Sequence, residues 1–272
     1  MMRYYDTKNN RLIYIANRAN ENYWDEHWKK IDTAKLYRPN VSPFNSVVGI
    51  TKKYLPLKSL IVEGGAGLAV NSWYLHLSGY RTIAIDFAPN TVSFLKKHRP
   101  EVRPNLGDVR KMPLESESVD GYWSFGVIEH FYKGYKTIVE EMYRVIRKDG
   151  YLFLTFPHMS KLRQFKAKRG FYEKWCEDDI QISNFYQFAL DDCQVISDFE
   201  KHGFKLIMQS GLDGVKGLKD EISIGKKWLQ GIYSGKTIKD KLLTRLLDVL
   251  LRKWFSHVAL LVFKKRSDDF SL

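Results

Sequence analysis

The sequence has few of the residues that covalent or metal cross-links require. Only two cysteines, Cys176 and Cys193, occur among 272 residues, with no CxxC pair and no dense Cys/His cluster. This argues against a disulfide framework and a structural zinc site, and we expect no bound metal. No apolar run approaches the ~20 residues that cross a bilayer, and the polar first ten residues predict no signal peptide. We therefore expect a cytoplasmic protein without a transmembrane segment.

The composition is that of an ordinary globular protein. Hydrophobic residues make up 44% and charged residues 28%, and a chain of this length buries one substantial core. The net charge of +13 favours an anionic partner, which could be nucleic acid, a phosphorylated metabolite or an acidic membrane surface. A surface excess of lysine without function is the alternative.

Strand and helix patterns alternate from residue 58 to residue 157. Apolar runs that end in glycine, aspartate or proline alternate with segments of helical periodicity. One further helix–strand pair follows at 195–210, and a final strand at 257–266. This alternation predicts an α/β fold in which a doubly wound, mostly parallel sheet is covered by helices on both faces.

Three segments lie outside the regular pattern. Residues 1–57, rich in Tyr, Trp and Asn, are predicted to be a largely helical N-terminal lid segment. Residues 58–272 then form the main domain, with insertions at 158–190 and 211–256. Within the first segment, residues 20–30 predict a helix over the cofactor, with Tyr23 and Trp24 on its apolar side. Ordinary packing of that helix is the alternative.

The glycine-rich stretch at 59–75 follows a buried strand and opens a helix. A dinucleotide fingerprint fails because Val70 stands where a third glycine belongs, and the Gly-Lys-Ser/Thr end of a Walker loop is absent. What remains is E-x-G-x-G, with Glu63 ahead of Gly65 and Gly67. A carboxylate buried at this turn is costly unless something pairs with it.

Two more carboxylates end the next strands. Asp86 ends the second strand and can accept hydrogen bonds from ribose hydroxyls, while Asp108 follows the third and can accept one from an adenine amino group. Together with Glu63 they would repel a phosphate but suit a ligand with a ribose, an adenine and a cationic amine. Helix capping is the alternative for Asp86 and Asp108.

Four motifs in order carry a resemblance to a known family. "VEGGAGLAV", "AIDFAP", "GDVRKMPLESESVDGYWSFGVIEHF" and "EEMYRVIRKDGYLFLTFP" together resemble the class I S-adenosylmethionine-dependent methyltransferases, in the branch with an EHF motif after strand four. The resemblance covers residues 58–157 well and 195–265 loosely. It implies a Rossmann-like sheet whose last strand is antiparallel, with helical additions.

The resemblance also implies a cofactor, S-adenosyl-L-methionine, with S-adenosyl-L-homocysteine as product. The loop residues would hold its methionine end, Asp86 and Phe87 its ribose and adenine, Asp108 and Val109 its adenine, and Phe125 and Gly126 the floor beside the sulfonium. The loop residues are Glu63, Gly64, Gly65, Ala66 and Gly67. Leu68 and Ala69 stand where the family commonly has a third glycine or another small residue, and we expect binding to survive this departure.

Methyl transfer needs an aligned nucleophile and, for an oxygen acceptor, a base. His130, just beyond strand four, is the candidate base, and a structural histidine that caps the next helix is the alternative. Glu129 is either a carboxylate that faces the substrate or a charge at a helix N-terminus. No N/D-P-P-Y/F sequence follows strand four, which argues against amino methylation of adenine, cytosine or glutamine.

Two added segments bear on the acceptor. Residues 158–175 hold six Lys/Arg against one Glu, interleaved with aromatics, and either capture an anionic acceptor or form a solvated helix face. Residues 239–255 predict an amphipathic helix that either packs on the sheet or lies at a membrane or dimer interface.

We therefore expect methyl transfer to a small molecule at oxygen, on an anionic, sugar or lipid-linked metabolite. An RNA methyltransferase and a non-catalytic methyltransferase-like binding protein are the alternatives. A homodimer is possible, and the sequence does not determine the oligomeric state.

Overall fold

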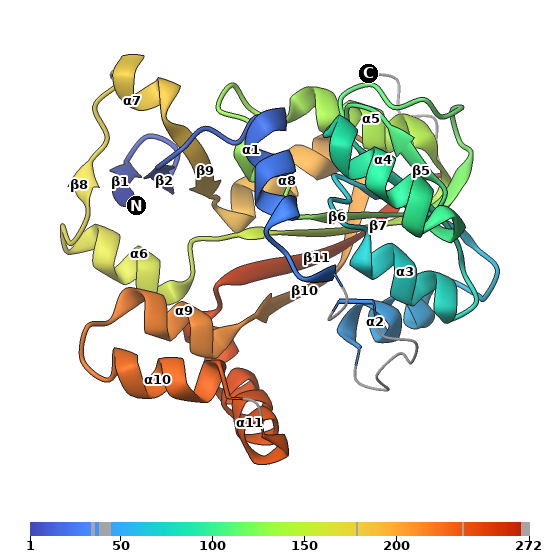
Figure 1. Ribbon diagram of the computed structural model, residues 1–272. Coiled ribbons are helices and arrows are strands. Elements are labelled where there is room, and N and C mark those ends of the chain that lie inside the picture. The colour runs from blue at the N-terminus through green and yellow to red at the C-terminus, as the bar shows by residue number, and fades with distance from the viewer. Residues whose placement is uncertain (34–35, 38–44, 178, 236, 268–272) are drawn as a thin grey trace.

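The computed structural model describes residues 1–33, 36–37, 45–177, 179–235 and 237–267. Its main element is a seven-stranded sheet of order β10-β11-β7-β6-β3-β4-β5 (Figure 1). The strands are β3 (Leu60–Gly64), β4 (Arg81–Asp86), β5 (Pro104–Leu106), β6 (Val119–Phe125), β7 (Ile146–Pro157), β10 (Phe204–Leu212) and β11 (Val258–Lys265). Strands β3 to β7 are parallel, and β11 runs antiparallel to both of its neighbours. The predicted Rossmann-like sheet with an antiparallel last strand is confirmed.

Helices cover both faces of this sheet. Those of the regular core are α2 (Ser46–Tyr54), α3 (Val70–Leu77), α4 (Pro89–His98), α5 (Lys136–Val145) and α8 (Asp192–Lys201), with 3-10 turns at Pro100–Val102 and Ile128–His130. Helices α5 and α8 contribute to the core on one face, and α2 and α3 to the core on the other. The carboxyl ends of the parallel strands are left open at one edge.

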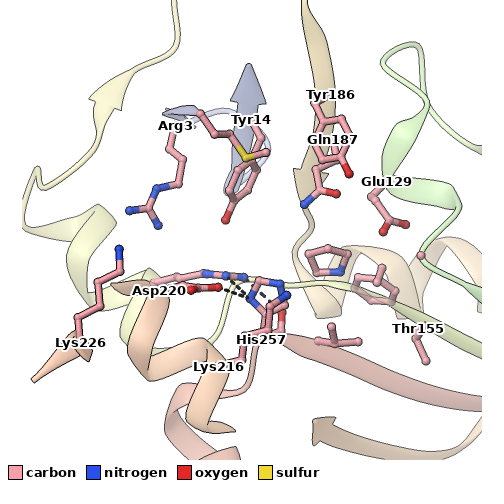
Figure 2. A pocket seen from close by; sticks show the side chains of 16 residues that line it. Arg3, Tyr14, Glu129, Thr155, Tyr186, Gln187, Lys216, Asp220, Lys226 and His257 are labelled. Atoms are coloured by element: carbon pink, nitrogen blue, oxygen red, sulfur yellow. Dashed lines mark hydrogen bonds and ion pairs between the residues drawn. The ribbon is translucent and has the colours of Figure 1, made fainter. Parts of the chain in front are cut away.

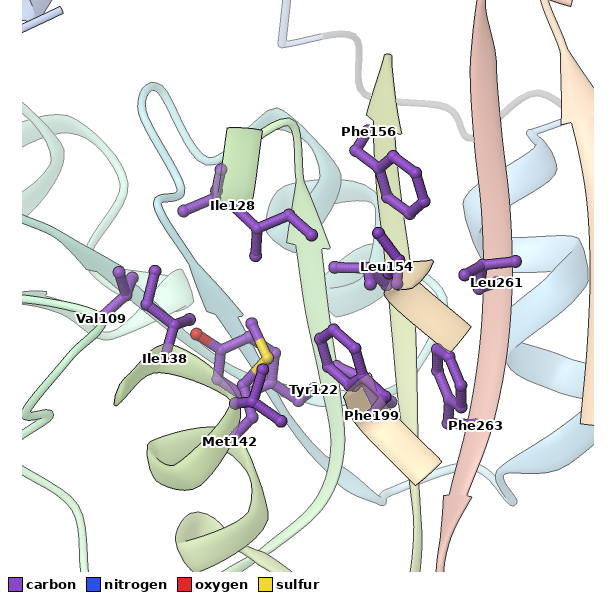
Figure 3. Packing of buried hydrophobic residues seen from close by; sticks show 14 of the residues in the cluster. Val109, Tyr122, Ile128, Ile138, Met142, Leu154, Phe156, Phe199, Leu261 and Phe263 are labelled. Carbon is purple, nitrogen blue, oxygen red and sulfur yellow. The ribbon is translucent and has the colours of Figure 1, made fainter. Parts of the chain in front are cut away.

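The two faces follow from the alternation of side chains along each strand. Tyr122 of β6 points into the cluster under α5 and α8, and the next residue, Trp123, points into the cluster under α2 and α3. Figure 3 shows Met142 of α5 and Phe199 of α8 packed against the first of these clusters. Because both clusters are fully buried, the sheet is a rigid support for whatever lies at its edge.

A second, four-stranded sheet joins the N-terminus to the first insertion. It has the order β8-β1-β2-β9 and consists of β1 (Met2–Asp6), β2 (Arg11–Ile15), β8 (Glu173–Lys174) and β9 (Phe185–Ala189). Helices α6 (Lys161–Lys168) and α7 (Asp179–Ser183) belong to the same insertion.

The prediction of a largely helical N-terminal segment is therefore wrong for its first 15 residues. Residues 2–15 form a local hairpin in which Met2–Asp6 pairs antiparallel with Arg11–Ile15, and β9, about 170 residues further along the chain, pairs with the other edge of β2. The helix expected at 20–30 is present as α1 (Glu21–Lys29). Expectations for residues 34, 35 and 38–44 lie outside the described residues.

The second insertion is a three-helix group between β10 and β11. It consists of α9 (Gly214–Glu221), α10 (Lys226–Tyr233) and α11 (Ile238–Phe255), and lies at the bottom of Figure 1. Among the described residues, no helix combines the length and apolarity that spanning a bilayer would take. Within those same ranges, no cluster of three or more His, Cys, Asp or Glu side chains is placed to hold a metal ion.

Candidate active site

Two cavities lie at the carboxyl edge of the large sheet and share Gly126 in their walls. The strand-end cavity has a volume of about 1410 Å³ and is lined by the loops after β3, β4, β5 and β6 and by α1. The polar cavity has a volume of about 560 Å³ and lies between the small sheet, the end of β7 and α9. The two cavities therefore adjoin each other at Gly126.

Nine of the eleven residues predicted to bind the cofactor line the strand-end cavity. They are Glu63, Gly65, Ala66, Asp86, Phe87, Asp108, Val109, Phe125 and Gly126. The other two, Gly64 and Gly67, do not line this cavity. A side-chain carbon at Gly64 would overlap the Tyr122 hydroxyl, and one at Gly67 would stand 2.5 Å from the Trp28 ring. Both positions require glycine because another side chain packs directly against the backbone there.

Glu63 is buried at the end of β3 and pairs with the first turn of α3. Its Oε2 accepts hydrogen bonds from the Ser72 backbone N–H at 2.9 Å and from the Ser72 hydroxyl at 2.5 Å, and Asn71 donates to Oε1 at 3.3 Å. Burial nevertheless raises the pKa of Glu63 to about 7. The carboxylate is therefore close to its ionisation midpoint at neutral pH, and a cation in the cavity would favour the ionised form.

The glycine loop is held in place by Asp86. Its Oδ2 accepts from the Gly67 N–H at 2.7 Å and its Oδ1 from the Ala88 N–H at 2.9 Å. Burial raises the pKa of Asp86. A carboxylate offers about four acceptor positions, so these hydrogen bonds leave Asp86 some capacity for a ligand. Asp86 thus supports the loop and lines the cavity at once.

Ala69, which with Leu68 stands where the family commonly has a third glycine or another small residue, adopts a left-handed backbone with φ of +52° at the N-cap of α3. Glycine adopts this conformation without cost, whereas alanine is strained there. Its side chain is buried against Leu95 and Val102. Leu68 and Ala69 also line the strand-end cavity, so the departure from the family pattern affects both the backbone and the cavity wall.

Asp108 lies at the rim of the strand-end cavity. Arg110 donates to it through Nε at 3.0 Å, and this hydrogen bond holds the pKa of Asp108 below its usual value. Both residues line the cavity, so a ligand there meets an ion pair and not an isolated carboxylate.

Helix α1 forms part of the wall of the strand-end cavity. Trp24 and Trp28 line the cavity and stack on each other with ring centroids 5.7 Å apart. Tyr23, predicted on the same side, packs against Tyr186. Asp25 anchors the helix, because its Oδ1 accepts from the Thr91 N–H at 3.0 Å and from the Thr91 hydroxyl at 2.8 Å at the start of α4.

His130 lines the strand-end cavity between Trp24 and Tyr186. Its Nδ1 lies 2.7 Å from the Tyr186 carbonyl oxygen, which can only accept, so Nδ1 carries the proton and Nε2 is the acceptor in the neutral ring. Burial lowers the pKa of His130 below its usual value. The ring is therefore neutral near pH 7.

Glu129 points instead into the polar cavity (Figure 2). It is 1% exposed, and its Oε2 has no partner from another residue in the described part of the chain. Burial raises the pKa of Glu129 to about 8. A buried carboxyl group with an unused oxygen is costly to maintain, and such groups concentrate at functional sites.

Four cationic side chains line the polar cavity in the described part of the chain, and of these only Arg163 belongs to the basic segment 158–175; the others are Arg3, Lys216 and Lys226. Figure 2 shows Arg3 and Tyr14 of the small sheet opposite Lys216, Asp220 and His257. The described lining is Met1, Arg3, Tyr14, Gly126, Glu129, Thr155, Phe156, Pro157, Arg163, Tyr186, Gln187, Lys216, Asp220, Lys226, His257 and Val258.

One carboxylate fixes several of these cations. Glu221 Oε1 accepts from Arg3 at 2.7 Å and from Arg163 at 3.0 Å, and Lys166 lies 3.0 Å from Oε2. Burial alone would raise the pKa of Glu221, but the ion pair with Arg163 brings it below its usual value. Three cations on one carboxylate leave an excess of positive charge beside the cavity. Only the basic run that contains Arg163 and Lys166 signalled this in the sequence.

Comparison with known proteins agrees with this geometry. The family described as "Methyltransferase domain" matches residues 62–154, from β3 to β7. A protein of Mycolicibacterium smegmatis that carries the name "Probable S-adenosylmethionine-dependent methyltransferase" is 24% identical over 212 residues, which is 78% of this chain and 73% of the relative. This chain carries a class I S-adenosylmethionine-dependent methyltransferase domain.

Solved structures share the methyltransferase fold. A TehB-like S-adenosylmethionine-dependent methyltransferase of Corynebacterium glutamicum superposes with a TM-score of 0.52 at 16% identity, over 92% of this chain and 100% of that one. A second structure is that of a phosphoethanolamine N-methyltransferase of Haemonchus contortus in complex with phosphomonomethylethanolamine and S-adenosylhomocysteine. It superposes with a TM-score of 0.53 at 14% sequence identity, over 98% of this chain and 71% of that one. At these identities the likeness shows the fold alone.

The methyltransferase uses S-adenosylmethionine as its cofactor, and the strand-end cavity fits that molecule. Its carboxylates suit ribose hydroxyls and a cationic amino acid end, and its volume exceeds the several hundred Å³ of typical ligand pockets. Its apolar walls, including Phe87 and Val109, suit the flat adenine.

Proposed function

We propose that the strand-end cavity binds the methyl donor through the residues predicted from the sequence. Glu63 would attract the ammonium group, Asp86 would accept from the ribose hydroxyls, and Asp108 would accept from the adenine amino group. Gly65, Ala66, Phe87, Val109, Phe125 and Gly126 would form the walls, with Gly64 and Gly67 as the close-packed support of the loop. The juxtaposition of these carboxylates in one cavity supports the assignment.

We further propose that the polar cavity binds the acceptor, and that the acceptor is an anionic small molecule methylated at oxygen. The observation that carries this is the cationic wall of a cavity that meets the donor cavity at Gly126. Burial lowers the pKa of Lys216, although the charges of Asp220 and Asp213 partly offset this, and its ammonium makes no hydrogen bond in the described part of the chain, so an anion would give it a direct partner. The Haemonchus contortus enzyme, which shares the fold, is solved in complex with phosphomonomethylethanolamine, a phosphorylated small molecule.

Glu129 is the proposed proton acceptor. Transfer to a hydroxyl forms a C–O bond, breaks the C–S bond of the sulfonium and releases the hydroxyl proton, which the Glu129 carboxylate would take. Glu129 suits this role because it is in the polar cavity and has an unused oxygen. His130, predicted from the sequence as the base, would instead orient the bound methyl donor through Nε2, the acceptor nitrogen of its neutral ring.

The test is an assay of S-adenosylhomocysteine formation with paired acceptors. Each pair consists of one hydroxylated molecule in a neutral form and in a carboxylated or phosphorylated form. We expect turnover with the anionic member, and we expect Lys216→Gln or Lys226→Gln to raise its KM about tenfold or more. Lys227→Gln is the matched control, because Lys227 neighbours Lys226 on α10 and is outside the described lining. Turnover confined to neutral members or to RNA would refute the assignment of the acceptor.

A further inference from the structure

Helix α11 presents an apolar face to solvent. Six of its large apolar side chains are between 42% and 65% exposed: Leu242, Leu243, Leu246, Val249, Leu250 and Trp254. At 100° per residue they occupy one side of the helix, which exposed Lys253 shares near the C-terminal end. Exposed apolar side chains gathered in this way mark interaction sites on soluble domains.

The orientation of this face is fixed by α9. A side-chain carbon at Gly217 would overlap the Phe255 carbonyl oxygen, so the two helices pack too closely for α11 to turn its leucines inward. Asp248 Oδ1 accepts from the Val215 N–H at 2.9 Å at the start of α9. In Figure 1, α11 lies at the outer edge of the molecule. The helix therefore does not pack on the sheet in the way that would bury its apolar face.

The charges around the face are mostly positive. Residues 239–255 hold five Lys/Arg and two Asp. Both aspartates are engaged within the helix group, Asp248 with α9 and Asp240 in the capping box of α11. Exposed Lys241, Arg245 and Arg252 follow one edge of the apolar face.

The C-terminal end of the face adds an aromatic–lysine pair. Lys161 Nζ of α6 lies 4.8 Å from the centre of the Trp254 ring. Tryptophan and lysine together suit the boundary between lipid chains and head groups, because each has an apolar body and a polar end.

We propose that α11 binds the surface of an anionic lipid bilayer, with its leucines at the level of the acyl chains and its basic edge on the lipid phosphates. An interfacial helix needs an apolar face, flanking cations and low overall hydrophobicity, and α11 has all three. The charge favours this occupant over a second copy of the chain, since two copies would bring like charges together. This site is separate from the proposed acceptor site.

The test measures co-sedimentation of the whole protein with vesicles, without donor or acceptor. We expect binding to phosphatidylcholine vesicles that contain about 30 mol% phosphatidylglycerol, weak binding to pure phosphatidylcholine, and loss of binding at ~0.5 M NaCl. The double variant Leu242→Gln/Leu246→Gln, which preserves helix propensity, should weaken binding about tenfold or more. Leu57→Gln is the matched control, because Leu57 and Leu242 are both 58% exposed.

Three outcomes would overturn the proposal. They are no binding of the wild-type protein to anionic vesicles, equal binding by the double variant, and a dimer in solution that the double variant converts to monomer. The last would assign the face to self-association. Circular dichroism and S-adenosylhomocysteine affinity, unchanged in the double variant, would show that the fold persists. Because no turnover is measured, failure here is independent of the proposed function.

Discussion

Gly126 and Glu129 lie so close together that a side-chain carbon at Gly126 would stand 3.1 Å from Glu129 Oε1. Gly126 also has a left-handed backbone, with φ of +65°, which glycine adopts freely. The buried carboxyl group therefore lies beside the residue that both cavities share. A methyl donor on one side and an acceptor on the other would meet next to it.

The pH dependence of turnover should distinguish Glu129 from His130 as the base. A carboxyl with a pKa of about 8 is protonated at lower pH, so with Glu129 as base the rate should rise about tenfold per pH unit up to about 8 and then level off. A histidine whose pKa is lowered would give a limb below 6.5 instead.

The measurement is kcat/KM for the acceptor at saturating donor between pH 5.5 and 9, a range chosen to span roughly both limbs. Glu129→Gln should lower kcat by about 10²–10⁴ and remove the limb near 8. His130→Gln should retain that limb. A limb below 6.5 that disappears in His130→Gln would make His130 the base.

Affinity for S-adenosylhomocysteine should fall at acidic pH. Because the pKa of Glu63 is raised to about 7, its carboxylate becomes neutral below that pH and no longer attracts an ammonium group. We expect the Kd from calorimetry to be constant above about pH 7 and to rise up to tenfold per unit below it. Glu63→Gln should bind weakly at every pH. An unchanged pH dependence in this variant would contradict the role of Glu63.

Loss of the Asp25 anchor should loosen the lid. Asp25→Ala removes the hydrogen bonds from Thr91 and Asn90 that hold α1 to the start of α4. We expect S-adenosylhomocysteine to bind about tenfold more weakly, because Trp24 and Trp28 are then less firmly placed over the glycine loop. Glu26→Ala, an exposed neighbour on the same helix, is the control. Equal affinity in both variants would show that α1 does not close the cavity.

Replacement of Ala69 by glycine should stabilise the protein. Its left-handed backbone costs an alanine about 1–2 kcal/mol, and the greater freedom of glycine in the unfolded chain returns part of this. We expect Ala69→Gly to raise the free energy of unfolding by about 0.5–1 kcal/mol, measured by denaturant titration. Ala88→Gly, at an ordinary φ of −81°, should lower it instead. A loss of stability in Ala69→Gly would refute the strain argument.

Local sequence patterns predicted which residues line the strand-end cavity, because parallel strands bring their carboxyl ends to one edge of the sheet. Glu63, Asp86 and Asp108 each end or follow a strand that is recognisable from a few neighbouring residues. The sequence did not predict the hydrogen bonds from Ser72 to Glu63. They depend on the path of the glycine loop, which places the start of α3 next to the end of β3.

The sequence by itself determined the sheet, its order of strands and helices, and the carboxylates at its edge, because strand and helix periodicities are local properties. Only the tertiary structure decided the polar cavity, which brings Arg3, Glu129, Lys216 and His257 together from four distant segments. It also decided that β2 pairs with β9 of the first insertion and that the apolar face of α11 stays exposed. These depend on which surfaces meet after folding, and contacts between distant segments leave no periodic trace in the chain.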